Sequence, residues 1–479
     1  MIRRPPRSTQ GVSSAASDVY KRQVRESDIE VRVNLSQGNI LKQISDQIQD
    51  RLPGDDSIPI RFVINASSRD RCKCEVAFLD GFNVFNRPAV ESIFGFRKRI
   101  SENTDKFTAV LVVPTGVGAE IGGHAGDATP VATLMSSICD RLITHPNVLN
   151  GSDLIELPEN TLYVEGSALS RLLMGTIGLQ SVRSNRVLVV IDEHQDQFFV
   201  DAAVNAVNAA RSSWSLICPM VLKLDPPLHM ESRYSASGRV TGDIDGIGGL
   251  TQYLEQLRNQ YDAVAISSVI SVPLSYHIDY FESEGQMLNP WGGVEAMLTH
   301  TISALFDTPS AHAPMLENQE ISNMETGIVD PRMAAESISL TFMQSVLRGL
   351  QRSPKIIVDP DAHTFNGTLT AEDVSCLVIP DNCLGLPTLA ALEQNIPVIA
   401  VKENKTVMKN DLDQLPWNPG QLHYAENYWE AAGIMACLKG GIDPTSLRRP
   451  LKQVLVDTSS NLDNIDRENL RSVPHAADN

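Results

Sequence analysis

The sequence has few cysteines, and they form no regular framework. Its 479 residues include seven, without any CxxC pair: Cys72, Cys74, Cys139, Cys218, Cys376, Cys383 and Cys437. An odd, scattered set indicates free thiols in a reducing compartment and argues against a disulfide scaffold. Two of them would share one side of a strand, but further metal ligands are not evident beside them. Aromatic residues are also few, at 5%.

Long hydrophobic runs and an excess of basic residues are lacking too. No apolar run approaches the roughly 18–20 residues of a membrane-spanning helix, so we expect a soluble protein. The formal net charge is −18, which argues against nucleic acid or an anionic membrane as a partner. We expect a cytoplasmic or plastid stromal location, and the question of an organelle signal stays open because the true N-terminus could be missing.

The two ends of the chain are set apart from the rest. Residues 1–23 show no apolar periodicity and carry five basic side chains and one acidic side chain, so the remainder has a net charge of −22. This segment resembles a translated sequencing adapter, with a basic targeting peptide as the alternative, and it is excluded from the fold prediction. Residues 456–479 are polar and are expected to form a flexible tail.

Between these ends the pattern predicts an α/β protein in two parts. Residues 24–100 are typical of a small α+β module, with strands at 29–35, 58–66 and 72–81 and an amphipathic helix at 38–52. Residues 101–455 alternate apolar strands with helices, which indicates a mainly parallel, Rossmann-like sheet covered on both faces, in one or two lobes. The expected strands are 107–113, 142–145, 160–166, 186–192, 218–225, 262–270, 355–359, 375–381 and 396–401, and 331–352 is expected to be helical.

The serine-elbow, P-loop, HExxH and CxxC motifs are absent, whereas residues 114–130, PTGVGAEIGGHAGDATP, are rich in glycine. Gly116, Gly118 and Gly122 follow a strand with the spacing of a dinucleotide fingerprint, which keeps an NAD(P)-binding oxidoreductase as an alternative. Two features oppose it: the next strand ends in His145, not in an acid, and the helix starts late. Together with Gly123, these glycines predict a strand-end loop whose backbone binds an anion.

His124 and Asp127 supply the chemical groups of this loop. The imidazole of His124 or His145 would act as a general acid or base near neutral pH, and Asp127 and Glu165 complete the predicted catalytic set. A structural alternative is that Asp127 or Thr129 caps the following helix. The same histidines and carboxylates could ligate a divalent metal, but their spacing is not diagnostic and the metal stays unassigned.

Further polar residues follow other strands, and ligands of parallel sheets collect at strand carboxyl ends. We expect Arg332 to clamp an anion and the helix start at 385–388 to hold a phosphate. The predicted binding residues, besides the loop glycines, are Asn147, Trp291, Gly292, Gly293, Arg332, Asp381, Asn382, Gly385, Thr388, Glu403 and Asn404. Glu295, His300, His312 and Glu336 stand in the same segments without an assigned role.

These segments carry a resemblance. PTGVGAEIGGHAGDATPVA, LITHPNVLNG, LYVEG, NPWGGVEAMLTHTI, SAHAP and VDPRMAAE are similar to the uncharacterised family called domain of unknown function 3326, known from cyanobacteria and photosynthetic eukaryotes. The resemblance covers roughly residues 104–410 and its motif set is specific. The family brings no established activity, so it implies boundaries but no chemistry.

A weaker likeness concerns two motifs. GGHAGDATPVATL resembles the glycine-rich N-lobe loop of lipid-linked glucosaminyltransferases, and GLPTLAALEQNIPVIAV resembles the C-lobe pattern of two-lobed glycosyltransferases and nucleotide-sugar epimerases. That likeness implies one motif in each lobe, with a nucleotide diphosphate at the second. This chain departs from it at Asn382, Cys383 and Leu384, where those families place Ser or Gly-Gly, and the middle segments have no counterpart.

The function predicted from these observations is an enzyme, transferase- or epimerase-like, that acts on a phosphorylated or nucleotide-activated small molecule. The alternative is a non-catalytic metabolite sensor that uses the same pocket. A small anionic metabolite is the expected partner, the cofactor is left unassigned, and a homo-oligomer is left open.

Overall fold

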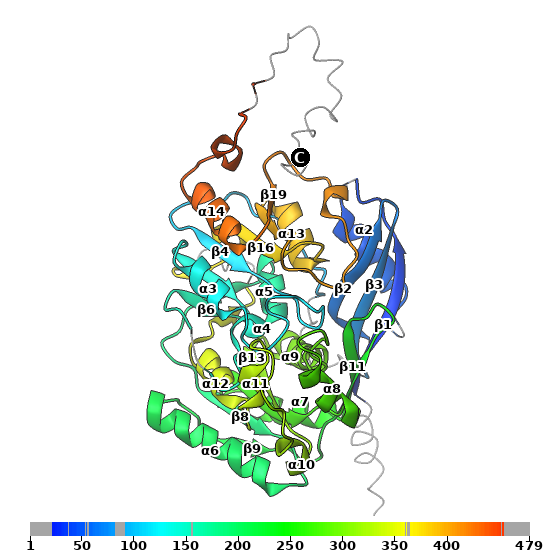
Figure 1. The fold of residues 1–479 in the computed structure, drawn as a ribbon, viewed down its shortest axis with the longest axis vertical. Helices are drawn as coiled ribbons and strands as arrows, with labels where there is room; N and C mark the ends of the chain where they lie inside the picture. Colours follow the sequence, from blue (N-terminus) through cyan, green and yellow to red (C-terminus); the bar gives the residue numbers. More distant parts are fainter. Residues whose placement is uncertain are drawn as a thin grey trace, which may run out of the picture.

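The computed structural model describes residues 22–451 and 453–454, apart from 37, 53, 55–56, 82–91, 155–156, 360 and 362–364. Residues 1–21 of the predicted adapter segment and the predicted tail 456–479 lie outside the described residues. The described part has two α/β lobes, one above the other in Figure 1, and an antiparallel sheet that runs along the side of both.

The antiparallel sheet has the strand order β10-β11-β1-β3-β2-β17. Its strands are β1 (Gln23–Arg32), β2 (Ile58–Ser68), β3 (Arg71–Asp80), β10 (His229–Tyr234), β11 (Val240–Asp245) and β17 (Leu384–Gly385). The amphipathic helix α2 (Ile40–Gln49) covers it with four buried aliphatic side chains. The predicted strands of 24–100 are present, but distant parts of the chain supply the remaining three, which the sequence did not reveal.

The first lobe contains a parallel sheet with the order β19-β18-β16-β4-β5-β6. Its strands are β4 (Thr108–Leu111), β5 (Arg141–Thr144), β6 (Thr161–Tyr163), β16 (Cys376–Pro380), β18 (Val398–Val401) and β19 (Leu422–Ala425). Its helices are α3 (Thr129–Ser136), α4 (Pro146–Leu149), α5 (Gly166–Leu173), α13 (Leu386–Gln394) and α14 (Tyr428–Lys439). The four central strands are buried along almost their whole length, as continuous apolar strands between helices should be.

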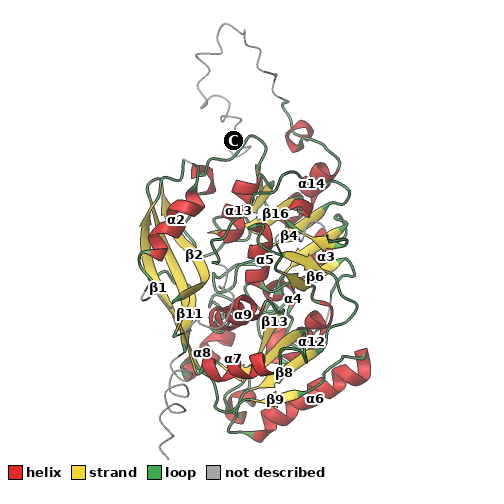
Figure 2. Ribbon diagram, turned by 180° about the vertical axis from the view of Figure 1, so that it is seen from behind, coloured by secondary structure: helices red, strands yellow, loops and turns green. Residues whose placement is uncertain are grey.

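The second lobe contains a four-stranded parallel sheet with the order β13-β12-β8-β9. Its strands are β8 (Val187–Ile191), β9 (Val221–Lys223), β12 (Ala263–Val269) and β13 (Ser310–Met315), and its helices are α6 (Gln197–Trp214), α7 (Ile247–Gln256), α8 (Leu274–Glu282), α9 (Gly292–Phe306), α10 (Gln319–Ser322), α11 (Ala334–Ser337) and α12 (Met343–Arg352). Figure 2 shows α6 on the outer edge of this lobe, with α9 between the two lobes. A small antiparallel sheet, β14 (Lys355–Ile357), β7 (Gly178–Gln180) and β15 (Thr368–Leu369), completes the fold.

The predicted α/β class is confirmed, with local differences. The expected helix at 331–352 is broken into α11 and α12, because residues 338–342 leave the helical path and Phe342 has a φ of 50°. Within the expected strand 355–359, residues 355–357 form β14, which pairs antiparallel with β7 and does not join a parallel sheet. Strand β13 was not foreseen.

Strand order also decides the glycosyltransferase likeness. The glycine loop follows β4, and the 385–401 motif follows β16, which is paired with β4 in one sheet. The two motifs therefore lie in the same lobe. The placement that the likeness implied, with one motif in each lobe, is wrong. In both parallel sheets the order reverses at the centre, between β4 and β16 and between β8 and β12. Such switch points open a crevice at the carboxyl ends of the strands.

Candidate functional site

A cavity of about 270 Å³ lies between the carboxyl ends of the two parallel sheets. The first lobe contributes the loop after β4, the start of α4 and the start of α5. The second lobe contributes the ends of β12 and β13, helices α8 and α9, and the segment around α11. Of the predicted site residues, nine line it: Gly116, Gly118, Gly123, His124, His145, Asn147, Glu165, Trp291 and Gly292.

Charge is distributed unequally over the cavity wall. Its described lining includes four glutamates, Glu165, Glu295, Glu317 and Glu336, and five histidines, His124, His145, His277, His300 and His312, but no lysine or arginine. The predicted anion clamp, Arg332, is outside this lining: its guanidinium pairs with Asp330 at 3.0 Å and donates to the carbonyl of Glu284. Among the described residues, the cavity wall therefore lacks the fixed cations that an anionic ligand needs.

The glycine loop does present backbone donors, but the protein's own carboxylates accept them. Asp127 accepts the N–H groups of Gly122 at 2.9 Å and His124 at 3.4 Å. Glu336 accepts the N–H of Ala125 at 2.8 Å. Burial raises the pKa of both carboxyls to about 7. Three donors expected to cradle an external anion are thus hydrogen-bonded within the protein, and the catalytic role of Asp127 stays a prediction.

Two asparagines hold the same loop in place. Asn147 donates to the carbonyls of Val113 at 2.9 Å and Gly122 at 2.8 Å. The fully buried Asn404 accepts the N–H of Ile121 at 2.9 Å and donates to its carbonyl at 2.8 Å. Both were predicted as ligand contacts, and their amides are used to fix the backbone instead.

Helix α3 begins without the side-chain cap that was expected. Its N-cap is Ala128, which makes no side-chain bond, and the hydroxyl of Thr129 reaches the carbonyl of Val148. The shape of the loop depends on glycine: a Cβ on Gly123 would lie 2.1 Å from the carbonyl oxygen of Ala119. Close packing, not pyrophosphate, accounts for this glycine.

His145 is buried at the junction of β5 and α4, and its hydrogen bond fixes its tautomer. The backbone N–H of Val113 donates to Nε2 of His145 at 3.1 Å, so this nitrogen is unprotonated and Nδ1 carries the hydrogen. Burial lowers the pKa of His145 to about 4, with nearby His300 as the second cause. At neutral pH the ring is uncharged and its Nε2 is not free to accept a proton from a substrate.

Glu165 caps helix α5, since its carboxylate accepts the N–H groups of Ser167 at 3.0 Å and Ala168 at 3.1 Å. It also contacts Nε2 of His300 at 3.2 Å. Burial lowers the pKa of His300. This predicted catalytic residue therefore links a helix N-terminus to a cavity histidine from the other lobe.

Two hydrogen-bonded chains reach the cavity from the second lobe. In the first, Nδ1 of His124 is 2.7 Å from the hydroxyl of Tyr280, and Tyr280 in turn bonds to Glu336. Both ends of this chain, His124 and Glu336, line the cavity, while Tyr280 is fully buried. Burial lowers the pKa of His124 to about 4, so the ring is neutral while the Glu336 carboxyl, with its pKa of about 7, can hold or release a proton.

The second chain joins Glu295, His312 and Ser268. Nδ1 of His312 is 3.0 Å from the Glu295 carboxylate, and its Nε2 is 2.9 Å from the Ser268 hydroxyl. The order of the three groups resembles a serine–histidine–acid triad. In such a triad the serine meets the substrate and the acid is buried, whereas here the serine is buried and the acid is accessible. Ser268 is fully buried and Glu295 lines the cavity. Glu295 and His312 both line the cavity, with Ser268 behind them.

The remaining predicted residues lie away from this cavity. Gly122, Gly293 and Arg332 stand behind its wall, Asp381 and Asn382 form a turn after β16, and the Glu403 side chain is exposed. Gly385 and Thr388 line a second cavity of about 140 Å³ that adjoins the first, and the Thr388 hydroxyl donates to the Cys383 carbonyl at 2.9 Å. No phosphate contact is needed to explain them.

Sequence reasoning missed His277 and Tyr280 and assigned no role to Glu295, His300, His312 or Glu336. Trp291 packs against both missed rings, at centroid distances of 5.4 and 5.5 Å. The available signal was the density of His and Glu between residues 277 and 336. In the part of the chain that the structure describes, these groups do not form a cluster of three metal ligands.

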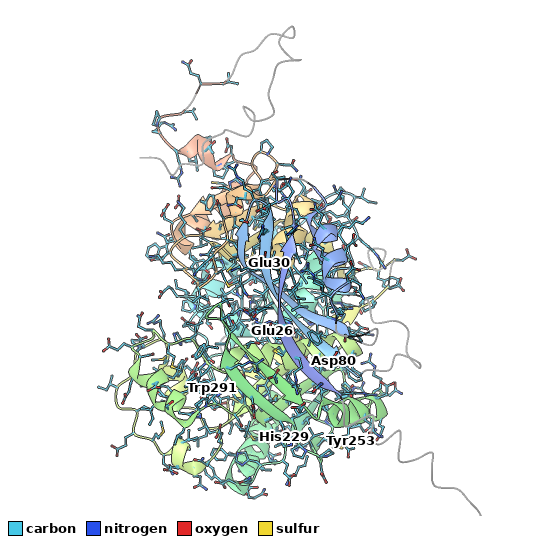
Figure 3. All side chains as sticks on the ribbon, turned by 90° about the vertical axis from the view of Figure 1, so that its right-hand side faces the viewer. Glu26, Glu30, Asp80, His229, Tyr253 and Trp291 are labelled. Atoms are coloured by element: carbon cyan, nitrogen blue, oxygen red, sulfur yellow. The ribbon has the colours of Figure 1, made fainter. Side chains whose placement is uncertain are left out.

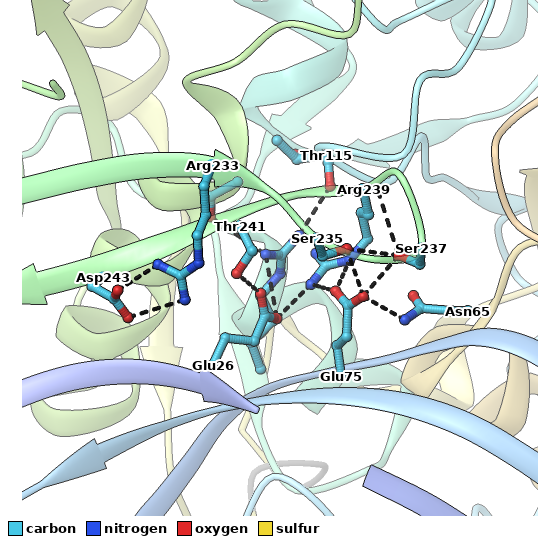
Figure 4. A network of polar contacts seen from close by, with 12 residues as sticks. Glu26, Asn65, Glu75, Thr115, Arg233, Ser235, Ser237, Arg239, Thr241 and Asp243 are labelled. Carbon is cyan, nitrogen blue, oxygen red and sulfur yellow. Dashed lines mark hydrogen bonds and ion pairs between the residues drawn. The ribbon is translucent and has the colours of Figure 1, made fainter. Parts of the chain in front are cut away.

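A buried charged network connects the antiparallel sheet to this site (Figure 4). Arg239, which directly precedes β11, is fully buried and pairs with Glu26 and Glu75. Arg61 pairs with Glu26 and donates to the carbonyl of Thr115, at the start of the glycine loop, at 3.0 Å. Figure 3 shows Glu26 near the middle of the sheet, where the two lobes meet. The sheet thus supports the loop directly.

Fold and site together define a two-lobed α/β protein with a cavity of histidines and glutamates between its lobes. The chain belongs to the family described as Protein of unknown function (DUF3326), whose model matches residues 108–448. The predicted family is therefore confirmed, and the match extends beyond the expected end at about residue 410. No activity is established for this family, and no solved structure matches the chain.

A relative supports the assignment and corrects the expected location. An uncharacterized lipoprotein of Synechococcus sp. (strain PCC 6301) is 34% identical over 344 residues, which cover 71% of this chain and 93% of that protein. Our expectation of a cytoplasmic or plastid stromal location is wrong, because this relative is named as a lipoprotein. Among the helices of the described residues, none combines the length and hydrophobicity needed to cross a membrane.

Proposed function

We propose that the chain is an enzyme that moves protons on a small polar molecule bound between the lobes, with Glu336 and Glu295 as the reacting carboxyl groups. The observation that carries this proposal is that the two carboxyl groups line one cavity but have different surroundings. Glu336 is buried and has a pKa of about 7, whereas Glu295 accepts the Nδ1–H of His312. Carboxyl pairs in contrasting surroundings are the usual acid and base of such sites.

The two groups have different roles in this proposal. Glu336, kept protonated up to neutral pH, donates a proton to the substrate as the general acid. Glu295 accepts one as the general base, and the His312–Ser268 chain fixes its orientation. Asn289 links the pair: its amide donates to Glu336 at 3.1 Å, and its oxygen accepts the N–H of Trp291 at the start of α9, the helix that carries Glu295. The hydroxyl of Tyr280 lies between Glu336 and the neutral ring of His124, so a proton of Glu336 can pass through Tyr280 to His124.

The proposed substrate carries no net negative charge. Four glutamates without a lysine or arginine among the described lining residues favour a neutral or cationic molecule. The internal use of the loop donors Gly122, His124 and Ala125 supports the same choice. This proposal replaces the anionic metabolite expected from the glycine loop.

The test is a thermal-shift screen of small polar metabolites, sorted into anions, neutral molecules and cations, because a ligand that binds only the native state raises the melting temperature. Neutral or cationic hits are then incubated with the protein and followed by NMR for conversion. We expect conversion by the parent chain and by Asp192→Asn, a buried carboxyl outside the cavity lining, and a loss of at least 100-fold in Glu336→Gln.

Three results would contradict the proposal. A hit set dominated by anions would refute the assigned charge of the substrate. Full turnover by both Glu336→Gln and Glu295→Gln would refute the assigned acid and base. Recovery of every bound ligand unchanged from the parent chain would favour the sensor.

A further inference from the structure

The second cavity, of about 140 Å³, adjoins the first. Six residues line both: Pro114, Thr115, His145, Gly166, Ala296 and His300. Two of them, His145 and His300, come from different lobes and stand at the junction. A ligand seated in the first cavity therefore has its nearest extension here, between the antiparallel sheet and helix α5.

The chemistry of the second cavity differs from that of the first. Its wall is mainly hydrocarbon, from Ile60, Phe62, Val112, Leu384, Leu386 and Met408, each of which is buried. Ile60 and Phe62 belong to β2, and Leu384 and Leu386 stand where β17 meets helix α13. An apolar cavity of this kind suits an apolar occupant better than water.

Arg171, Arg61 and Ser167 of this wall each make contacts within the protein, although Nη1 of Arg171 has no hydrogen-bond partner among the described residues. Arg171 pairs with Asp307 at 2.8 Å. Arg61 donates to the carbonyl of Thr115 at 3.0 Å and belongs to the buried charged network. The hydroxyl of Ser167 donates to the Glu165 carboxylate. Apart from Nη1 of Arg171, the surface that remains for a ligand is the aliphatic one.

We propose that the two cavities hold one amphipathic molecule, with its polar head among the histidines and glutamates and a hydrocarbon portion in the second cavity. The identity of the head rests on the proposed function; the hydrocarbon portion rests on the second cavity alone. His300 suits the junction, since its Nε2 faces Glu165 while its buried Nδ1 has no hydrogen-bond partner among the described residues. A polar atom at the base of the head would satisfy it.

The experiment measures binding of three probe series by calorimetry: n-alkylamines, n-alkanols and n-alkyl carboxylates, each from three to eight carbons. We expect alkylamine affinity to rise up to about fourfold for each added methylene until the second cavity is full. Met408→Phe narrows that cavity without touching the first. It should leave propylamine binding unchanged and stop the rise at a shorter chain.

Leu384→Phe, at a residue that lines the second cavity and not the first, provides a second variant with the same expectation. Thermal unfolding of both variants checks that they fold. An alkylamine affinity that is independent of chain length in the parent protein would overturn the inference and leave the proposed charge of the head intact. A chain-length dependence that both folded variants retain unchanged would also overturn it, because the chain would then lie elsewhere.

The three probe series also separate the proposal of a non-anionic head from the proposal of a hydrocarbon site in the second cavity. Carboxylates that bind most tightly, with a chain-length dependence that Met408→Phe shortens, would support the hydrocarbon site and refute the non-anionic head. Absence of binding by all three series would overturn both. Amines and alcohols that bind with the expected dependence, and carboxylates that do not, would support both.

Discussion

The raised pKa of Glu336 predicts a pH-dependent change in stability that one substitution should remove. Burial raises this pKa from 4.5 to about 7. Between these values the native chain binds more protons than the unfolded chain, so the free energy of unfolding falls as the pH rises from about 4.5 to 7 and levels off above that. At about 1.4 kcal/mol per pKa unit, the loss is about 3 kcal/mol.

Glu336→Gln keeps the shape and the acceptor oxygen for Ala125 and Asn289 but removes the ionisation. Relative to the parent chain, we therefore expect the variant to gain about 3 kcal/mol of unfolding free energy between pH 5 and pH 8. Urea denaturation at four pH values across this range measures it. A difference between variant and parent that is the same at pH 5 and pH 8 would refute the raised pKa and, with it, the proposed general acid.

Asp192→Asn is the matched control for this experiment. Burial raises the pKa of Asp192 to about 7 as well, and its carboxylate accepts the N–H groups of Glu193 and Leu228; this residue follows β8 and is not among the residues that line the cavity. We expect the same pH-dependent gain in stability but unchanged ligand conversion. The pair separates the energetic effect of a buried carboxyl from its chemical use.

Three further predictions concern the supports of the site. Asn404→Ala leaves the buried N–H and carbonyl of Ile121 without partners and should cost about 1–3 kcal/mol, with faster hydrogen exchange in residues 114–128; unchanged exchange there would contradict the role. Gly123→Ala forces a Cβ against a carbonyl and should lower the melting temperature by several degrees, which scanning calorimetry checks. Arg239→Met strands two buried carboxylates and should cost about 3–5 kcal/mol, measured by urea denaturation.

The sequence was most informative where local periodicity and tertiary packing agree. Buried parallel strands such as 375–381 can be recognised in the sequence as continuous apolar runs, because both of their faces are covered. The strands β10 and β11 were missed because they are polar along one face, and because β11 joins the sheet by pairing with β1, some 200 residues earlier in the chain, while β10 pairs with β11. Pairing partners of that kind have no local signature.

The sequence indicated that several of the predicted residues lie together, but not the contacts that they make. Strand order brings the 114–125 loop and residues 145–147 to one cavity, as expected of strand carboxyl ends. The sequence could not show that the loop donors face Asp127 and Glu336, because Glu336 lies more than 200 residues away from the loop. Nor could it show that Arg332 is committed to Asp330.

The glycine loop shows why a glycine signature alone does not identify a phosphate site. Glycines let consecutive N–H groups turn to one side, and such a concave set of donors attracts whichever anion is nearest. Here the nearest anions are side chains of the same protein, Asp127 inside the loop and Glu336 across the cavity. The loop then serves the opposite purpose: it gives Glu336 a hydrogen-bonded seat in a buried wall, where a carboxyl with a pKa near 7 is available to exchange protons with a ligand.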